Sequence, residues 1–201
     1  MKLLFATTNK SKAAYYQDML SGMKIDVLSL GDLNVSEIEI EENGLTPEAN
    51  ARLKVRQYWN FVKMPLMAVD YGLYIDNFSQ EKQPGMQVRR VGGKRLSDQE
   101  MLEYYREELK KVGGESEGKW TTGMAIMLGK DKIFSSSFDT PTFFLNKICL
   151  EKNEGEPLNS IQYVRELGKY KAQLSNEEKS KLVERQNIEI KKFIENCLMS
   201  Y

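Results

Sequence analysis

The sequence predicts a mixed α/β fold, because short apolar runs typical of strands alternate along it with segments of helical character. Two capping boxes mark the starts of two predicted helices, and a short polar link between two strand-like runs predicts a hairpin. The length of 201 residues allows a sizeable core, in one large domain or in two lobes that share a sheet. The sequence contains no internal repeat, low-complexity tract or flexible linker.

The N-terminal segment predicts a strand, a polar loop and a helix. Residues 1–6 are apolar, residues 7–12 are polar, and residues 13–20 have helical character. In this arrangement backbone amides and a helix N-terminus face an anion, and Lys12 adds a positive charge in the first turn. The loop therefore suits phosphate, although an ordinary turn capped by Ser11 also explains it. Two further extended segments are expected at residues 25–30 and 35–40.

The stretch from residue 41 to residue 76 reads as an acidic loop, a helix and a buried strand. Thr46 is a suitable N-cap, and Pro47 follows at the first helical position. Asn50 and Lys54 then stand one turn apart on the same face of this helix. The apolar run 65–69 predicts a strand that ends at Asp70 and continues over residues 73–75.

The second half of the chain alternates strands and helices in the same way. Residues 77–93 are rich in loop-forming residues, and the capping box of Ser97 and Glu100 opens a helix that runs to Val112. The remaining segments are expected to be strands at 120–128 and 132–138, an extended stretch at 141–150, a polar loop at 153–157 and a helix at 176–198 opened by the capping box of Ser175 and Glu178. The aromatic side chains of Trp120, Phe134 and Phe138 are expected in the core.

The composition excludes several classes of function. There are no histidines, which removes Ser-His and Cys-His nucleophile pairs, histidine general bases and histidine metal sites. Lys plus Arg and Asp plus Glu balance at 29 each, so no global field draws the protein to nucleic acid or to a membrane. The apolar opening is too short for a signal peptide or a membrane span, so we expect a soluble, cytoplasmic protein. Cys149 and Cys197 show no metal-binding spacing, and we expect both to be reduced.

The acidic residues at the two ends of the stretch 41–76 form the candidate active site. Ligands in open α/β sheets lie beyond the carboxyl ends of strands, which favours Asp70 as a catalytic carboxylate. In a chain without histidine, catalysis must use carboxylates, lysines, tyrosines or a hard metal held by oxygen, for which Mg²⁺ fits best. The alternatives are a solvated acidic loop at Glu41 and Glu42, and an aspartate that only caps a turn before Gly72.

Several short motifs, in a fixed order over almost the whole chain, carry a resemblance to a known family. They are residues 6–12 (ATTNKSK), 41–46 (EENGLT) with Asn50, Ala51 and Lys54, 68–73 (AVDYGL), Pro84 and Gly85 with Arg90, Gly168 and Lys169, and 172–179 (AQLSNEEK) with Arg185. With these motifs the chain resembles the inosine triphosphate pyrophosphatase family. Its members hydrolyse non-standard purine nucleoside triphosphates such as ITP and XTP to the monophosphate and pyrophosphate.

The resemblance implies a fold, a cofactor and a set of site residues. The fold would be a single domain over residues 1–201, with an elongated mixed sheet flanked by helices and two lobes around a central cleft. The protein would be a homodimer that binds a nucleoside triphosphate and uses Mg²⁺. Asp70 would be the general base and a metal ligand, and Glu41 the second metal carboxylate. The implied substrate-binding residues are Thr7, Thr8, Asn9 and Lys12 at the phosphates, and Lys54, Tyr71, Lys179 and Arg185 in or beside the nucleotide pocket.

The chain departs from the family around Asp70 and at the base-binding end. Val69 and Tyr71 stand where the family has aspartate and serine, and residues 156–160 replace its Phe-Gly-Tyr-Asp-Pro motif. Residues 183–185 (VER) replace its Ser-His-Arg motif. Because base selectivity depends on such partners, the sequence leaves the preferred base open. It also leaves open a nucleotide-binding or regulatory protein without turnover, and a purely structural dimer subunit.

Overall fold

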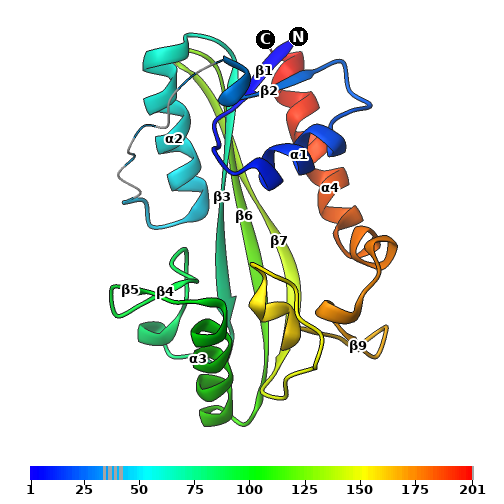
Figure 1. The fold of residues 1–201 in the computed structure, drawn as a ribbon. Helices are drawn as coiled ribbons and strands as arrows, with labels where there is room; N and C mark the ends of the chain where they lie inside the picture. The colour runs from blue at the N-terminus through cyan, green and yellow to red at the C-terminus, as the bar shows by residue number, and fades with distance from the viewer. Residues whose placement is uncertain (34, 36–37, 39, 41–42, 201) are drawn as a thin grey trace. The chain divides into compact units, whose positions relative to one another are not determined.

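The computed structural model describes residues 1–33, 35, 38, 40 and 43–200. The chain divides into two compact units, each built from separate stretches of sequence (Figure 1). The first unit comprises Met1–Tyr71, Thr122–Phe138 and Gln186–Tyr201, and the second comprises Gly72–Thr121 and Asp139–Arg185. The sequence predicted one domain over residues 1–201, with two lobes around a central cleft. Both the single domain and the cleft stay predictions.

A five-stranded mixed sheet has the strand order β2-β1-β3-β6-β7. Its strands are β1 (Lys2–Phe5), β2 (Asp26–Ser29), β3 (Leu66–Ile75), β6 (Glu115–Gly129) and β7 (Lys132–Leu145). Strand β1 pairs in parallel with both β2 and β3. The tight turn between β6 and β7 can join only antiparallel neighbours. Together with four α-helices, this sheet confirms the predicted mixed α/β class.

The helices begin where the sequence supplies a cap. They are α1 (Lys10–Met19), α2 (Pro47–Val62), α3 (Asp98–Lys111) and α4 (Asn176–Met199). Thr46 caps α2 through a bond from Ala49 N, and Ser97 caps α3 with the full capping box. Ser175 and Glu178 exchange the same pair of bonds at the start of α4. Among the described residues, no helix combines the length and the apolar character that a membrane span requires.

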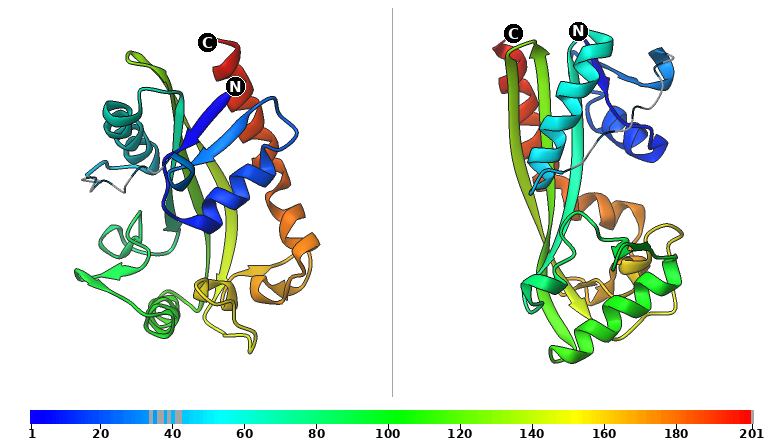
Figure 2. Two further views of the ribbon diagram at one scale, coloured as in Figure 1. Left: turned by 45° about the horizontal axis from the view of Figure 1, so that its top comes forward. Right: turned by 90° about the vertical axis from the view of Figure 1, so that its left-hand side faces the viewer.

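In the first unit, alternate residues of each strand enter two different hydrophobic cores, as the pleat of a strand requires. On β1, Leu3 and Phe5 belong to one core, whereas Leu4 and Ala6, the residue after the strand, belong to the other. Helices α1 and α4 cover the first core and α2 covers the second (Figure 1 and Figure 2). The helical residues of the first core include Ala13, Tyr16, Met19, Ile190 and Ile194, and those of the second include Ala51, Val55 and Tyr58.

The second unit has its own core, in which α3 packs on the distal parts of β3 and β7. Tyr105 and Leu109 of α3 are buried there with Ile75 and Phe144. Short elements complete the unit: the strand pairs β4 (Arg90–Val91) with β5 (Lys94–Arg95) and β8 (Tyr163–Val164) with β9 (Lys169–Tyr170), and the 3₁₀ turns η2 (Gln80–Lys82), η3 (Pro157–Ser160) and η4 (Lys171–Gln173). A further 3₁₀ turn, η1 (Gly31–Leu33), belongs to the first unit.

Three details of the sequence-based prediction are wrong. The strand does not end at Asp70, since β3 runs without a break from Leu66 to Ile75. A glycine at position 72 weakens a strand but does not stop it here, because β6 lies beside β3 in the sheet and the next residue, Leu73, forms a bridge to Gly85. The N-cap of α1 is Asn9 and not Ser11, because the helix already begins at Lys10.

The third error concerns β7, which continues through Pro141 to Leu145 where two separate segments were expected. Proline is tolerated because β7 is the last strand in the sheet order, and on such a strand every second N–H points away from the sheet. The sequence also missed the two-residue strands β8 and β9. The extended segment expected at residues 35–40 lies largely outside the described residues.

Candidate functional site

The candidate site in the first unit is built around Asp70 and Tyr71, in the middle of β3. Strand β1 ends at Phe5, which is paired with Met67. Asp70 and Tyr71 therefore lie beyond the carboxyl end of the neighbouring parallel strand, where α/β proteins bind ligands. Because successive side chains of a strand point to opposite faces of the sheet, Asp70 lies on the face that α2 covers and Tyr71 on the face that α1 covers.

Two side chains of α2 hold the carboxylate of Asp70. Lys54 Nζ lies 3.3 Å from Oδ1, and Asn50 Nδ2 donates to Oδ2 at 3.0 Å. The side chains of Lys54 and Asp70 are 14% and 13% exposed, so the ion pair is mostly shielded from water. Because Asn50 and Lys54 are one helical turn apart, a single helix face fixes both oxygens of the carboxylate.

Asn50 also fixes the loop that precedes α2. Its Oδ1 accepts a hydrogen bond from Gly44 N at 2.8 Å, while its amide group donates to Asp70. A Cβ atom at Gly44 would lie 2.6 Å from Asn50 Oδ1 and 2.9 Å from Asn50 N, so only glycine fits this close approach. Asn50 is 1% exposed and links the end of the acidic loop to the catalytic candidate.

The N-terminus of α2 is held against the sheet. A Cβ at Gly123 of β6 would meet Glu48 N at 2.1 Å, so the helix backbone lies directly on that strand. Glu48 accepts hydrogen bonds from Ser135 and Ser137 of β7 at 2.6 and 3.2 Å. These contacts fix where the N-terminal part of α2, which carries Asn50 and Lys54, lies against the sheet.

On the other face, the loop of residues 7–12 and the start of α1 approach Tyr71. Asn9 Oδ1 accepts from Lys12 N at 3.0 Å, and Thr7 Oγ1 accepts from Asn9 N at 3.2 Å. These bonds order the loop and leave the N-terminus of α1, with its partial positive charge, at its end. Lys12 Nζ lies 4.5 Å from the centre of the Tyr71 ring, a cation–π contact.

The hydroxyl of Tyr71 contacts the hydroxyl of a second tyrosine, Tyr16. The two oxygens lie 3.3 Å apart, and Tyr16 is 1% exposed and packs edge-on against Phe5. Burial raises the pKa of Tyr71 to about 12, and it also raises the pKa of Tyr16. Both side chains are therefore neutral at physiological pH. The ring of Tyr71 offers Lys12 an aromatic surface, and the contact with Tyr16 fixes its orientation.

A comparison with known proteins places the chain in a family. The model of the Ham1 family matches residues 3–194. The chain belongs to the Ham1 family. This family membership agrees with the resemblance seen in the sequence motifs.

Relatives of this Ham1-family chain are named as pyrophosphatases. The chain is 28% identical over 197 residues to the dITP/XTP pyrophosphatase of Lactobacillus acidophilus, with 93% of each chain covered. It is 28% identical over 186 residues to that of Bacillus subtilis, with 90% of each covered. A match to the dITP/XTP pyrophosphatase of Oceanobacillus iheyensis has 35% identity over 111 residues and spans 55% of each chain.

Solved structures of Ham1 proteins share the fold. The Staphylococcus aureus Ham1 protein superposes with a TM-score of 0.79 at 22% identity, covering 98% of this chain and 99% of that chain. A Ham1 protein from Coxiella burnetii gives a TM-score of 0.78 at 23% identity, covering 96% and 99%. At this level of identity the likeness shows the fold alone.

The structure brings together some of the site residues predicted for this Ham1 chain. Asp70 and Lys54 are in contact, as are Lys12 and Tyr71. Thr7, Thr8 and Asn9 form the loop between β1 and α1. Glu41 lies outside the described residues, so its metal-binding role stays a prediction. In the described part of the chain, no group of three acidic or cysteine residues forms a ready metal site.

Lys179 and Arg185 belong to the second unit. Lys179 Nζ lies 3.5 Å from Asn153 Oδ1, which also accepts from Asn159 Nδ2 at 3.0 Å. Arg185 is the last residue of this unit, in α4. Their predicted roles at the nucleotide stay predictions.

The sequence-based site omitted Asn50, although it stood in a family motif and on the face of Lys54. Its two bonds, to Gly44 and Asp70, depend on how the helix docks and could not be read from spacing. The available signal was an amide side chain one turn before a lysine on the same face of the predicted helix.

Proposed function

We propose that this Ham1-family chain is a Mg²⁺-dependent nucleoside triphosphate pyrophosphatase that acts on non-standard purine nucleotides and releases the monophosphate and pyrophosphate. The observation that carries the proposal is the carboxylate of Asp70, held by Lys54 and Asn50 beyond the carboxyl end of β1. The names of the relatives, dITP/XTP pyrophosphatases, support the reaction and the substrate class.

The donors at Asp70 suit Mg²⁺. Each carboxylate oxygen has lone pairs beyond the single contact with Lys54 or Asn50, so both contacts leave room for a hard cation or a water. Asp70 and Glu41 would hold the ion. When bound, Mg²⁺ supplies charge neutralisation for the phosphates and lowers the pKa of a coordinated water.

Residues of the chain would provide proton transfer and phosphate binding. Asp70 accepts a proton from the attacking water, and the ammonium of Lys54, 3.3 Å from its Oδ1, helps to hold the carboxylate in position. The N-terminus of α1 and Lys12 offer N–H groups and positive charge to the phosphates. We assign Thr7, Thr8 and Asn9 to the same phosphate loop, and Lys179 and Arg185 to binding of the nucleotide.

The test is pyrophosphate release from a panel of NTPs and dNTPs that includes ITP, dITP and XTP, with and without Mg²⁺. We expect release that depends on the metal, and a loss of about 10²–10⁴-fold in Asp70→Asn. The matched control is Asp26→Asn, an exposed aspartate of β2 that should leave the rate unchanged. If no nucleotide yields pyrophosphate but calorimetry detects nucleotide binding, the binding-only alternative replaces this proposal.

Two further expectations accompany the proposed enzyme. A homodimer predicts twice the mass of 23.2 kDa in solution, which light scattering measures directly. A cytoplasmic location predicts recovery in the soluble cytoplasmic fraction of the source cells. A monomer by light scattering or recovery with membranes would contradict these two expectations without affecting the proposed chemistry.

A further inference from the structure

The side chain of Tyr71 makes two contacts for which the proposed reaction gives no reason. Its hydroxyl lies 3.3 Å from that of Tyr16, a residue of the core that is 1% exposed. Its ring lies beside the ammonium of Lys12, with Nζ 4.5 Å from the ring centre. Because the hydroxyl meets the core and the ring meets Lys12, an effect of Tyr71 on a ligand passes through Lys12.

Tyr16 is itself anchored by neighbours on the sheet and on two helices. Its ring packs edge-on against Phe5 of β1 and against Tyr15 of α1, with ring centres 5.0 and 5.3 Å apart. The hydroxyl of Tyr15 donates to Asn187 Oδ1 of α4 at 2.6 Å. All these residues belong to the first unit. Tyr16 therefore gives the ring of Tyr71 a rigid support.

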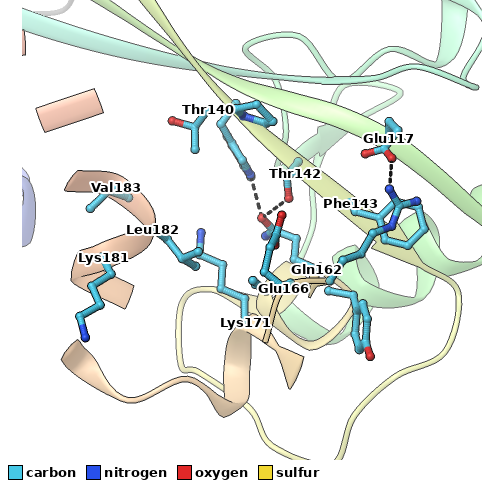
Figure 3. Close-up of a pocket in the computed structure, with 15 residues that line it drawn as sticks. Glu117, Thr140, Thr142, Phe143, Gln162, Glu166, Lys171, Lys181, Leu182 and Val183 are labelled. Carbon is cyan, nitrogen blue, oxygen red and sulfur yellow. Dashed lines mark hydrogen bonds and ion pairs between the residues drawn. The ribbon is translucent and has the colours of Figure 1, made fainter. Parts of the chain in front are cut away.

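Lys12 and Tyr71 form a contact between a cation and a neutral ring. Burial raises the pKa of Tyr71 to about 12, so its ring carries no negative charge at physiological pH. A neutral ring attracts an ammonium through its quadrupole but does not cancel its charge. An ion pair does, as where Arg165 contacts both the ring of Phe143 and the carboxylate of Glu117 in the second unit (Figure 3). The contact with Tyr71 restrains Lys12 without neutralising it.

Such a restraint favours the binding of an anion by a lysine. The long side chain of lysine has many rotamers, and a ligand that orders it loses part of the binding free energy. A ring that already holds the ammonium reduces this loss before the ligand arrives. Lys12 lies in the first turn of α1, where Asn9 is the N-cap. Its ammonium and the N-terminal amides of the helix can therefore meet the same phosphate.

We propose that Tyr71 is a positioning residue that holds the ammonium of Lys12 at the phosphate loop, and that Tyr16 fixes the orientation of the Tyr71 ring. This inference rests on the proposed function, because it takes Lys12 as a phosphate ligand. The serine that the related family has at this position carries no ring and cannot make the contact.

The test is a double-mutant cycle with the full chain and pyrophosphate, the proposed product, which contains phosphates but no base. Calorimetry in a buffer with Mg²⁺ gives its dissociation constant for the wild type, Tyr71→Leu, Lys12→Met and the double variant. We expect Tyr71→Leu to weaken binding about threefold to tenfold in the wild-type background, and less than about twofold in the Lys12→Met background. A purely structural role of Tyr71 would give the same loss in both backgrounds.

Two further variants separate the ring from the fold. Tyr71→Phe keeps the ring and should bind pyrophosphate within about twofold of the wild type. Tyr104→Leu is the matched control, because Lys82 lies 6.0 Å from the centre of that ring in the second unit, and it should leave binding unchanged.

Four results would overturn the proposal: no pyrophosphate binding by the wild type, no loss in Tyr71→Leu, an equal loss in both backgrounds, or equally weak binding by Tyr71→Phe and Tyr71→Leu. The cycle measures binding and not turnover. A wild type that binds pyrophosphate but releases none from any nucleotide would refute the proposed enzyme, while the cycle would still decide the role of Tyr71.

Discussion

Replacing Asn50 with alanine should destabilise the first unit far more than its size suggests. The change removes a hydrogen bond to the Asp70 carboxylate, worth about 1.5–3 kcal/mol, and the acceptor of Gly44 N, worth about 1 kcal/mol. Gly44 is partly exposed, so water recovers some of the second loss. Alanine also favours the helix by about 0.5 kcal/mol. We expect the free energy of unfolding to fall by about 2–3 kcal/mol.

The assay is urea unfolding followed by circular dichroism and by tryptophan fluorescence, to which Trp59 on α2 contributes. Asn60→Ala is the matched control: the same substitution in the same helix at an exposed position, with an expected gain of about 0.5 kcal/mol. The reasoning would be refuted if the two variants differed by less than about 1 kcal/mol. Asn50→Asp separates the two bonds, because it keeps the acceptor for Gly44 but places a second carboxylate against Asp70. This repulsion raises the carboxyl pKa in the folded state above that in the unfolded chain, so the variant should lose stability as the pH rises from the unfolded-state pKa through the folded-state pKa.

Three other outcomes follow from the same structure. Gly123→Ala places a methyl group inside the backbone of α2 and should cost about 1–3 kcal/mol in urea unfolding, whereas Gly22→Ala, with open space around its Cβ, should not destabilise. Lys94 lowers the pKa of Glu100 to about 2, so wild-type stability should fall as the pH drops from about 4.5 towards 2. Thermal unfolding of Glu100→Gln should show a smaller fall over this range. Lys171→Met should raise the melting temperature at pH 7, because burial lowers the lysine pKa and penalises its charged form. The wild-type chain should approach the variant as the pH rises towards 10.5, since the unfolded chain then releases its extra proton.

Local rules were sufficient to predict the starts of α2, α3 and α4, although not that of α1. At Thr46, Ser97 and Ser175 the cap and its partner lie within three residues, so their bonds form whatever the rest of the fold does. The mixed α/β class followed from the same local patterns. Predictions failed where sheet position decided the outcome, as at Pro141, which a central strand excludes and an edge strand accepts.

The candidate site was predicted only in part for a related reason. The sequence marked Asp70 and Lys54, but their contact depends on which face of β3 meets α2. The bond between the hydroxyls of Tyr16 and Tyr71 joins residues 55 positions apart, so no short pattern contains it.

The alternation of β3 gives a physical reason for the order of residues in this motif. Asp70 must face α2, because only that helix presents Lys54 and Asn50 to its two oxygens. The next residue must then face α1, whose first turn carries Lys12. A small polar residue at that position would leave the ammonium of Lys12 without an aromatic surface, whereas Tyr71 gives it one that is locked by Tyr16. Insertion of a single residue between Val69 and Asp70 would exchange the two faces and separate the carboxylate from Lys54. Such a variant should lose metal-dependent pyrophosphate release completely, and measurable release from it would contradict the assignment of Asp70 to the face of α2.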